Sequence, residues 1–362
     1  MKKCLSLVLI LTLVFSLAAC GQPAADSESQ GSSPAGEISL GNDNVFKLGI
    51  CVYSFSNINA SYLRKGMENY CNEDGKAEYQ VVDAALDQTK QNEQIDTFLG
   101  AGVDALLINL VEAEAAATVI EKVRPYNIPI VFYNRAPAVE VLATYEKCWY
   151  VGIGMEMPGR LQAEILVDMW KANPEFDKNS DGTIQYCIIQ GDLGHPDAVA
   201  RTKANQEVLE ASGIPSELLD MQVASWDTTK AKEVMEVWLG RYGDEIEVVL
   251  CNNDAMLLGV VEALRAGGYY DEGASRIEVL GINAIPQVLD LVESGDVLGT
   301  VFSDTWAQAR ACVDIALNVL NGKEPTEDTE WVLGDDKCVR IPDARITADS
   351  IGDAREAYAH CT

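Results

Sequence analysis

The chain has 362 residues and a formal net charge of −29 at pH 7, with 56 acidic residues against 27 basic ones. This charge excludes nucleic acid as a general partner, because phosphates require a basic face, and it argues against electrostatic adhesion to anionic lipid. A strongly acidic surface mainly favours solubility. The length exceeds what one ordinary sheet core holds, so we expect two α/β domains.

The first 19 residues have the layout of an export signal. Lys2 and Lys3 precede an apolar run from Leu5 to Phe15, which is too short to span a bilayer as a mature helix. The segment ends in Leu-Ala-Ala-Cys and resembles a bacterial lipoprotein signal, whose cleavage leaves Cys20 as a lipidated N-terminus. A plain signal peptide with an incidental cysteine is the alternative. Residues 20–45 are mostly small, polar or acidic, which predicts a flexible tether.

From Phe46 onward, short apolar runs rich in β-branched residues alternate with helical patterns. This alternation predicts parallel sheets with right-handed crossovers. The predicted strands are Lys47 to Tyr53, Tyr79 to Val82, Ala105 to Asn109, Ile128 to Tyr133, Ile184 to Gln190, Glu247 to Cys251, Ile277 to Ile282 and Leu298 to Phe302. The predicted helices include Tyr62 to Asn72, Gln88 to Gly100, Ala113 to Tyr126, Thr228 to Arg241, Ala255 to Ala266 and Thr305 to Leu320.

A polar loop before the strand at Ile184 has the oxygen-ligand spacing of a calcium loop. Positions 1, 3, 5, 7 and 9 of the EF-hand pattern are occupied, and Gly182 supplies the turn. Position 12, which should be a glutamate, is Ile188, so an EF-hand proper is excluded and a carboxylate must come from elsewhere. Spacing alone supports calcium and an ordinary polar turn about equally. The five candidate ligands are Asp177, Asn179, Asp181, Thr183 and Gln185.

Polar side chains follow most of the predicted strands. In parallel sheets the carboxyl ends of strands converge on ligand sites, and amides, carboxylates and hydroxyls suit a polyhydroxylated ligand. If Pro196 opens a helix, Asp197 and Arg201 share one face at its N-terminus, although an ordinary salt bridge has the same spacing. Any one asparagine could simply cap a helix. The positions concerned are Asn57, Asn134, His195, Asp197, Arg201, Asn253, Asn283 and Ser303, with Trp226 at another helix start.

Several motifs, in the same order, resemble the galactose/glucose-binding proteins of bacterial sugar importers. The resemblance covers roughly Phe46 to Ile346. The motifs are QNEQID (Gln91 to Asp96), INLV (Ile108 to Val111), VIEKVR (Val119 to Arg124), the DxNxDGxIQ loop from Asp177, GxxGHPDAxAR (Gly191 to Arg201), WDTTKAK (Trp226 to Lys232), IEVVLCNNDAM (Ile246 to Met256) and GTVFSD (Gly299 to Asp304).

This resemblance implies a periplasmic-binding-protein type 1 fold. In such an α/β fold, two doubly wound parallel-sheet lobes are joined by a three-strand hinge, with the ligand cleft between them. The implied lobes are residues 46–153 plus 304–340 and residues 154–303 plus 341–362. The resemblance also implies that Glu247 completes a structural Ca²⁺ site. The sugar ligands carried over unchanged are Asn134, His195, Asp197, Arg201, Trp226 and Asn253.

Four positions depart from the family pattern. The family has aspartate at Asn57 and Asn283, an aromatic residue at Asn59, and asparagine at Ser303. Because an amide lacks the charge-assisted strength of a carboxylate, we expect weaker hexose affinity or a different sugar. A sugar acid is also conceivable beside Arg201. One hypothesis is that a nearby ring replaces the lost aromatic residue, the candidates being Phe55, Tyr62 and Trp306.

The implied function is that of a lipid-anchored, monomeric substrate-binding protein outside the cytoplasm. It would capture a monosaccharide by hinge closure and deliver it to the permease of an ABC importer. A sensor that presents its closed form to a chemoreceptor or sensor kinase would use the same site. An enzyme is disfavoured, because the sequence lacks a phosphate loop and a nucleophile elbow. Eight cysteines follow Cys20 without a zinc-type spacing, and three of them, Cys51, Cys187 and Cys251, are predicted to be buried.

Overall fold

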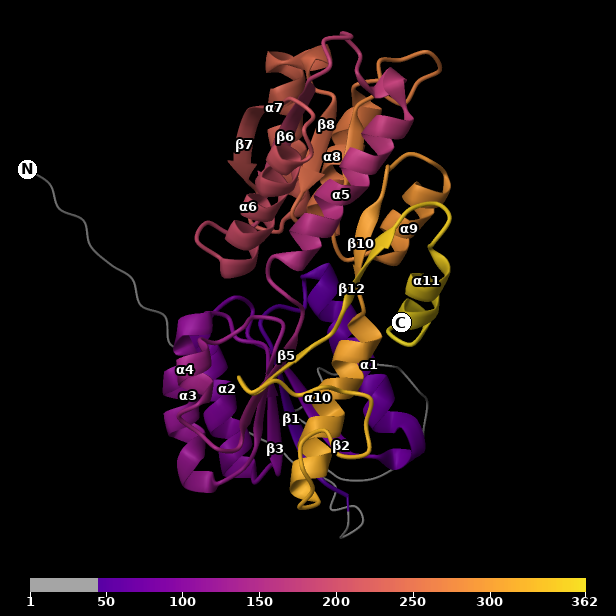
Figure 1. Cartoon of the computed structure of the whole chain (residues 1–362). Coiled ribbons are helices and arrows are strands. Elements are labelled where there is room, and N and C mark those ends of the chain that lie inside the picture. Colours follow the sequence, from indigo (N-terminus) through magenta and orange to yellow (C-terminus); the bar gives the residue numbers. More distant parts are fainter. Residues whose placement is uncertain (1–44) are drawn as a thin grey trace, which may run out of the picture. The chain divides into compact units, whose positions relative to one another are not determined.

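The computed structural model describes residues 45–362. The predicted signal peptide, Cys20 and all but the last residue of the predicted tether lie outside the described residues. Within residues 45–362, strands and helices alternate and build two lobes (Figure 1). No helix in this part of the chain combines the length and the apolar composition needed to cross a lipid bilayer.

The first lobe is built on a six-stranded sheet in the order β2-β1-β3-β4-β5-β11, and every pair in it is parallel. Strand β1 pairs with both β2 and β3, so the order of the strands reverses at β1. In open parallel sheets, ligands bind beside such a reversal, at the carboxyl ends of the strands. The strands are β1 (Lys47–Val52), β2 (Glu78–Asp83), β3 (Ala105–Ile108), β4 (Ile130–Tyr133), β5 (Cys148–Gly152) and β11 (Cys338–Arg340).

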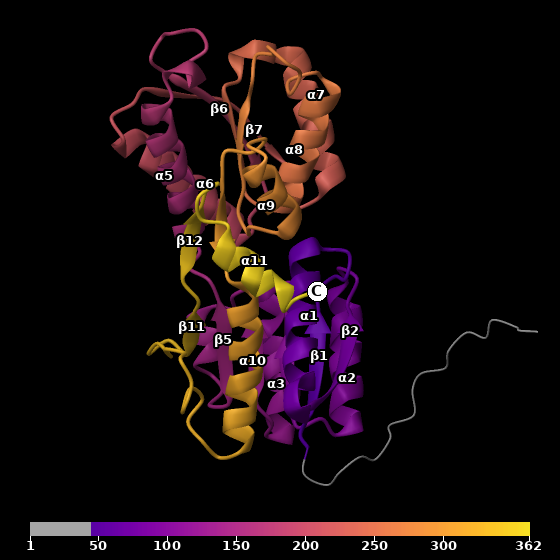
Figure 2. The same ribbon diagram turned by 90° about the vertical axis from the view of Figure 1, so that its right-hand side faces the viewer.

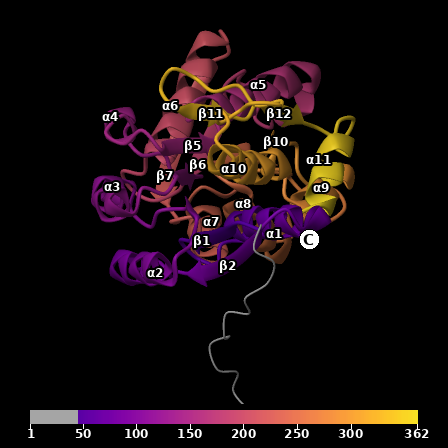
Figure 3. The same cartoon turned by 90° about the horizontal axis from the view of Figure 1, so that it is seen from below.

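Helices cover both faces of this sheet (Figure 3). Helices α2 (Gln88–Ala101) and α3 (Ala116–Val123) pack on one face, while α1 (Ile58–Asn72) and α10 (Thr305–Leu320) pack side by side on the other. The predicted helix from Ala113 to Tyr126 is divided, because 3₁₀ turns flank α3 on both sides. The short elements of the chain are η1 (Glu73–Gly75), η2 (Ala113–Ala115), η3 (Arg124–Tyr126), α4 (Val139–Leu142), η4 (Pro174–Phe176) and η5 (Gly243–Glu245).

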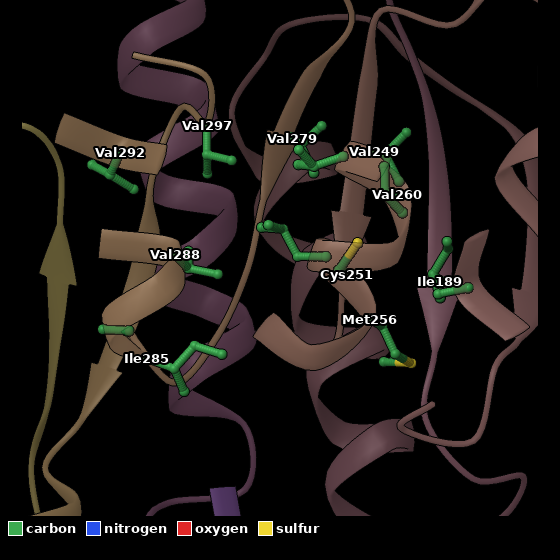
Figure 4. Packing of buried hydrophobic residues seen from close by; sticks show 14 of the residues in the cluster. Ile189, Val249, Cys251, Met256, Val260, Val279, Ile285, Val288, Val292 and Val297 are labelled. Atoms are coloured by element: carbon green, nitrogen blue, oxygen red, sulfur yellow. The ribbon is translucent and has the colours of Figure 1, made fainter. Parts of the chain in front are cut away.

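The second lobe has a four-stranded parallel sheet in the order β7-β6-β8-β9. Apolar side chains such as Val249 and Cys251 of β8 and Val279 of β9 pack under helices (Figure 4). The strands are β6 (Ile184–Gln190), β7 (Ser216–Val223), β8 (Val248–Cys251) and β9 (Glu278–Leu280). The helices are α5 (Met157–Ala172), α6 (Pro196–Ala211), α7 (Thr228–Arg241), α8 (Asp254–Ala266), α9 (Pro286–Glu293) and α11 (Gly352–Ala359).

One strand pair differs from the predicted all-parallel arrangement. Strands β10 (Thr300–Ser303) and β12 (Asp343–Ile346) are antiparallel, with Ser303 opposite Asp343. They are antiparallel because β10 leads out of the second lobe toward α10 (Figure 1), while β12 brings the returning chain from β11 back toward α11 (Figure 2). No sequence pattern predicted β12, whose middle residues are exposed.

The chain passes between the two lobes three times. The passages follow β5, β10 and β11, and they lead to α5, α10 and β12 respectively. The predicted fold class, two parallel-sheet α/β lobes, is confirmed. The residues at which one lobe gives way to the other stay a prediction.

The eight cysteines of the described residues are all buried and free of disulfides, so Cys51, Cys187 and Cys251 lie in the interior as predicted. Burial raises the pKa of thiols such as Cys187 to about 12. These side chains therefore behave as small apolar groups, not as nucleophiles or metal ligands.

Candidate functional site

One cavity lies where the carboxyl ends of the strands from both lobes meet. About 560 Å³ between its wall residues is free of protein atoms, the open mouth of the cavity included. Sequence reasoning placed nine residues in a ligand site, and the structure brings all nine to the wall of this cavity. They are Asn57, Asn134, His195, Asp197, Arg201, Trp226, Asn253, Asn283 and Ser303.

The first lobe presents amide groups at the ends of β1 and β4. Asn57 caps α1, since its Oδ1 accepts a hydrogen bond from the backbone N–H of Ala60 at 3.0 Å. Its Nδ2 group therefore remains a donor for the cavity. Asn134 follows β4 with a φ angle of 64°, a left-handed conformation that asparagine tolerates better than most residues.

His195, from the second lobe, lines the cavity and is the N-cap residue of α6. Its Nδ1 accepts a hydrogen bond from the backbone N–H of Asp197 at 3.2 Å. Burial, together with the charges of Arg135 and Arg201, lowers the pKa of His195 to about 3. The ring is therefore neutral at pH 7, with its hydrogen on Nε2, and can donate one hydrogen bond.

Arg201 is the most deeply buried cation of the cavity wall. One guanidinium nitrogen donates to the backbone carbonyl of Asn252 at 2.7 Å, and another lies 3.6 Å from a carboxylate oxygen of Asp197. Burial raises the pKa of Asp197, and the Arg201 charge opposes that shift. The Nε group of Arg201 is buried without a partner, while the residue as a whole lines the cavity.

Trp226 reaches the cavity because a glycine lies under its ring. Its backbone has a φ angle of 61°, and its indole meets the His195 ring edge to face at 5.4 Å. A Cβ atom at Gly191 would lie 2.1 Å from Cζ2 of the indole. The position of this ring therefore depends on the absence of a side chain at residue 191.

Asn253 and Asn283 complete the second lobe's amides. Asn253 caps α8 by accepting from the Met256 N–H at 3.0 Å. Asn283 has a φ angle of 127° in a loop held by the buried carboxyl of Asp254, which accepts from the Ile285 N–H at 2.9 Å. Burial raises the pKa of Asp254 to about 7. Asp254 thus fixes the loop that carries Asn283.

Sequence reasoning missed four residues of the wall: Tyr53, Arg135, Ile153 and Gln308. Arg135 directly follows the predicted Asn134, so the strand end that identified Asn134 could also have identified Arg135. Its guanidinium stacks over Tyr53 at 4.3 Å and lies 3.6 Å from Asp192 of the other lobe.

The hypothesis that another ring replaces the aromatic residue missing at Asn59 is wrong for the three proposed side chains, because none of them lines the cavity. Tyr62 packs on Tyr358 and Trp306 stacks on His360, while Phe55 lies beneath Arg64. Asn59 itself lines the wall, and its Oδ1 is buried without a partner.

The predicted cation loop adopts a compact polar turn. The Asp177 carboxylate accepts from the N–H groups of Asp181 and Gly182, and Gly182 has the positive φ angle of 75° that such a turn needs. Glu247 lies against this loop. Its two carboxylate oxygens accept from the N–H groups of Lys178 at 2.8 Å and Gln185 at 3.0 Å.

The donor set of the loop fits a hard cation in composition. Burial, with the Asp177 charge adding to it, raises the pKa of Glu247, and the Oε1 of Gln185 is buried without a partner. The amides of Asn179 and Gln185 donate to Asp181. Within residues 45–362, no three His, Cys, Asp or Glu side chains converge as a metal cluster, so cation binding requires these amides to turn their oxygens inward.

Comparisons with known proteins agree with this architecture. A family model described as a periplasmic binding protein domain matches residues 48–324. The D-galactose/methyl-galactoside binding periplasmic protein of Haemophilus influenzae is 37% identical over 308 residues, which cover 85% of this chain and 91% of that protein. A putative rhizopine-binding protein of Rhizobium meliloti is 30% identical over 279 residues, covering 76% and 85%.

Solved structures show the same relationship. An ABC transporter solute binding protein from Bacillus halodurans with bound myo-inositol has a TM-score of 0.72 at 26% identity, covering 88% of this chain and all of that one. These relatives are extracytoplasmic binding proteins, not enzymes, which agrees with the expectation that this chain is not an enzyme. The chain therefore belongs to the periplasmic binding protein family.

Proposed function

We propose that this chain is the extracytoplasmic, lipid-anchored substrate-binding protein of an ABC importer and that it binds a neutral monosaccharide of the galactose/glucose type. One observation carries the proposal: hydrogen-bonding side chains from both lobes converge on a single cavity. Closure around a ligand that bonds to both lobes would then be the signal that a permease reads. The D-galactose/methyl-galactoside binding relative from Haemophilus influenzae supports this ligand class.

The chemistry of the wall matches a polyol, whose hydroxyl groups both donate and accept. The donors include Nε2 of His195 and the guanidinium of Arg201, and the acceptors include the carboxylate of Asp197. The indole of Trp226 offers an apolar face for a sugar ring. A cyclic polyol such as myo-inositol and a sugar acid are the competing ligands, the second because Arg135 and Arg201 both line the cavity.

Isothermal titration tests the proposal most directly. Residues 43–362 form one compact unit, which is unfolded to release bound ligand, refolded with Ca²⁺ and titrated. Galactose, glucose, other hexoses and pentoses, myo-inositol and galacturonate are compared. Micromolar or tighter binding of a neutral hexose is the expected result. If no sugar or polyol bound, the result would contradict the proposal. Binding of galacturonate alone would reassign the ligand to a sugar acid.

The anchor and the partner need their own experiments. Labelling with a radioactive fatty acid is expected in the natural chain and absent in Cys20→Ser. A permease subunit is expected to copurify with the anchored protein in the presence of ligand. Copurification with a chemoreceptor or a sensor kinase instead would favour sensing over transport.

We further propose that the loop from Asp177 to Gln185, with Glu247, holds a structural Ca²⁺ ion. The supporting observations are the approach of Glu247 to the loop, the charge of three carboxylates there, and the unpartnered oxygen of Gln185. When bound, the ion would neutralise those carboxylates and tie the loop to the start of β8. It would brace the second lobe without touching the sugar.

Replacing Gly191 with alanine is expected to weaken sugar binding at least about tenfold. The new Cβ cannot share space with the indole, so Trp226 must leave its position and the sugar loses an apolar partner. Titration calorimetry measures the loss. Gly240→Ala is the matched control, because no atom lies within 4 Å of a Cβ at that helical position. Equal affinities of the two variants would contradict the role given to Trp226.

A further inference from the structure

A carboxyl group lies directly behind one wall residue of the cleft. The antiparallel pairing of β10 with β12 sets Asp343 opposite Ser303, and the two side chains are hydrogen-bonded at 2.8 Å. Ser303 lines the ligand cavity, whereas Asp343 lines a different cavity to which Ser303 does not contribute. Asp343 therefore touches the ligand site only through the Ser303 hydroxyl.

The charges of the cleft also act on Asp343. Burial raises the pKa of Asp343 to about 7, while the hydrogen bond from Ser303 and the Arg201 charge lower it and the Asp197 charge raises it further. The residue that follows β10 is Asp304, whose carboxylate caps α10. Helix α5 also packs on β12, and its titratable residues are Arg160, Glu164, Asp168, which pairs with Arg345, and Lys171.

We propose that Asp343 is a positioning residue of the ligand site. Its carboxylate accepts a hydrogen bond from the Ser303 hydroxyl, so that a lone pair of the Ser303 oxygen faces the ligand as an acceptor. This inference rests on the proposed function. A serine hydroxyl rotates freely unless a partner fixes it.

The arrangement forms a chain in which a ligand hydroxyl donates to Ser303 and Ser303 donates to Asp343. An ionised end makes such a chain stronger, because each hydrogen bond polarises the next. Protonated Asp343 no longer accepts through that oxygen, and the Ser303 hydrogen turns away. Ligand binding therefore favours the ionised carboxyl, so the affinity is full at high pH and decreases as the pH falls through about 7.

The test is a titration of the purified full chain with its best neutral sugar at pH 8.5 and pH 5.5. We expect the wild type to bind about three- to tenfold more weakly at pH 5.5, which corresponds to the net contribution of one ordinary hydrogen bond. Asp343→Asn keeps an acceptor oxygen but cannot ionise, so its affinity should not change between the two pH values. Asp343→Ala and Ser303→Ala should each weaken binding at pH 8.5, and their double variant should lose no more than the larger single loss.

Asp349→Asn is the matched control, because Asp349 is an exposed carboxyl a few residues further along, and it should keep the wild-type pH profile. Melting curves establish that each variant is folded. A pH dependence that persists in Asp343→Asn would overturn the proposal and assign the titration to another buried carboxyl, Asp197 or Asp254. Full additivity of Asp343→Ala and Ser303→Ala would overturn it too. A wild type that binds no sugar at either pH would overturn the proposed function, and this assignment with it.

Discussion

Replacing Arg201 with methionine is expected to weaken sugar binding at least about a hundredfold, or about 2.7 kcal/mol. The guanidinium is buried beside Asp197 and below the indole of Trp226, and its Nε donor has no protein partner. A ligand oxygen that accepts from the guanidinium at the cavity wall gains a charge-assisted hydrogen bond in a place with little water. Methionine keeps much of the apolar stem and removes every donor, so the ligand loses its strongest partner.

The same change also disturbs the empty protein. It leaves the carbonyl of Asn252 without its donor and Asp197 without its cation, which costs up to about 3–5 kcal/mol for a buried pair broken on one side. The pKa of Asp197 should rise further, because the opposing positive charge is gone. Titration calorimetry and thermal melting are therefore measured together.

Lys203→Met is the matched control for this prediction. Lys203 lies two residues further along α6, is largely exposed, and pairs with Glu207 at the surface. Its replacement removes the same formal charge from the same helix but should leave the affinity within about twofold, because exposed pairs contribute little. If Arg201→Met bound sugar as tightly as Lys203→Met, the central role of Arg201 would have to be abandoned.

The ligand cavity was largely predictable because strand ends leave a local signature. Polar residues directly after an apolar run mark the carboxyl edge of a parallel sheet, which is how Asn134, Asn253 and Asn283 were found. Tyr53 and Arg135 escaped because an aromatic ring at a strand end reads as core and an arginine beside it reads as surface. The stacking of Arg135 on Tyr53 is visible only in the folded structure.

Asp343 could not be found from the sequence at all. Nothing near it in the chain is part of the site, and its partner Ser303 lies 40 residues earlier. The two meet because the third passage of the chain returns beside the second, which is a property of topology. Short antiparallel pairings of this kind carry no periodic signal, since β12 has only four residues and two of them are exposed.

Burial explains the outcome for two of the strands, β6 and β7, whereas β5 was missed although all its residues are buried. β6 was predicted with its observed bounds because all seven of its residues are buried, so it reads as one apolar run between turns. β7 was missed because it lies at the edge of its sheet and most of its residues are exposed or half-buried, which leaves a mixed pattern of acidic and apolar residues. Helix α7 was predicted with its observed bounds, and Asp227 caps its N-terminus.

Calcium is expected to raise the thermal stability of the protein, and Glu247→Gln is expected to remove that increment. For a loop with a dissociation constant near 1 μM, 1 mM Ca²⁺ would add about 4 kcal/mol, or roughly 10 °C in Tm. The glutamine keeps the size of the side chain but offers one acceptor where Lys178 and Gln185 require two, so the metal-free variant is also less stable. The informative quantity is therefore the difference between melting with Ca²⁺ and with a chelator.

Glu245→Gln separates this effect from a general loss of negative charge. Glu245 lies two residues earlier in η5 and is exposed, so its replacement should leave the calcium increment intact. Equal increments in Glu247→Gln and the wild type would remove Glu247 from the site. If calcium did not raise the melting temperature of the wild type, the loop would be an ordinary polar turn. The carboxylates of Asp177 and Asp181 would then serve only to accept hydrogen bonds from the backbone N–H groups of that turn. In that case the raised pKa of Glu247 would be a cost of burial that no cation offsets.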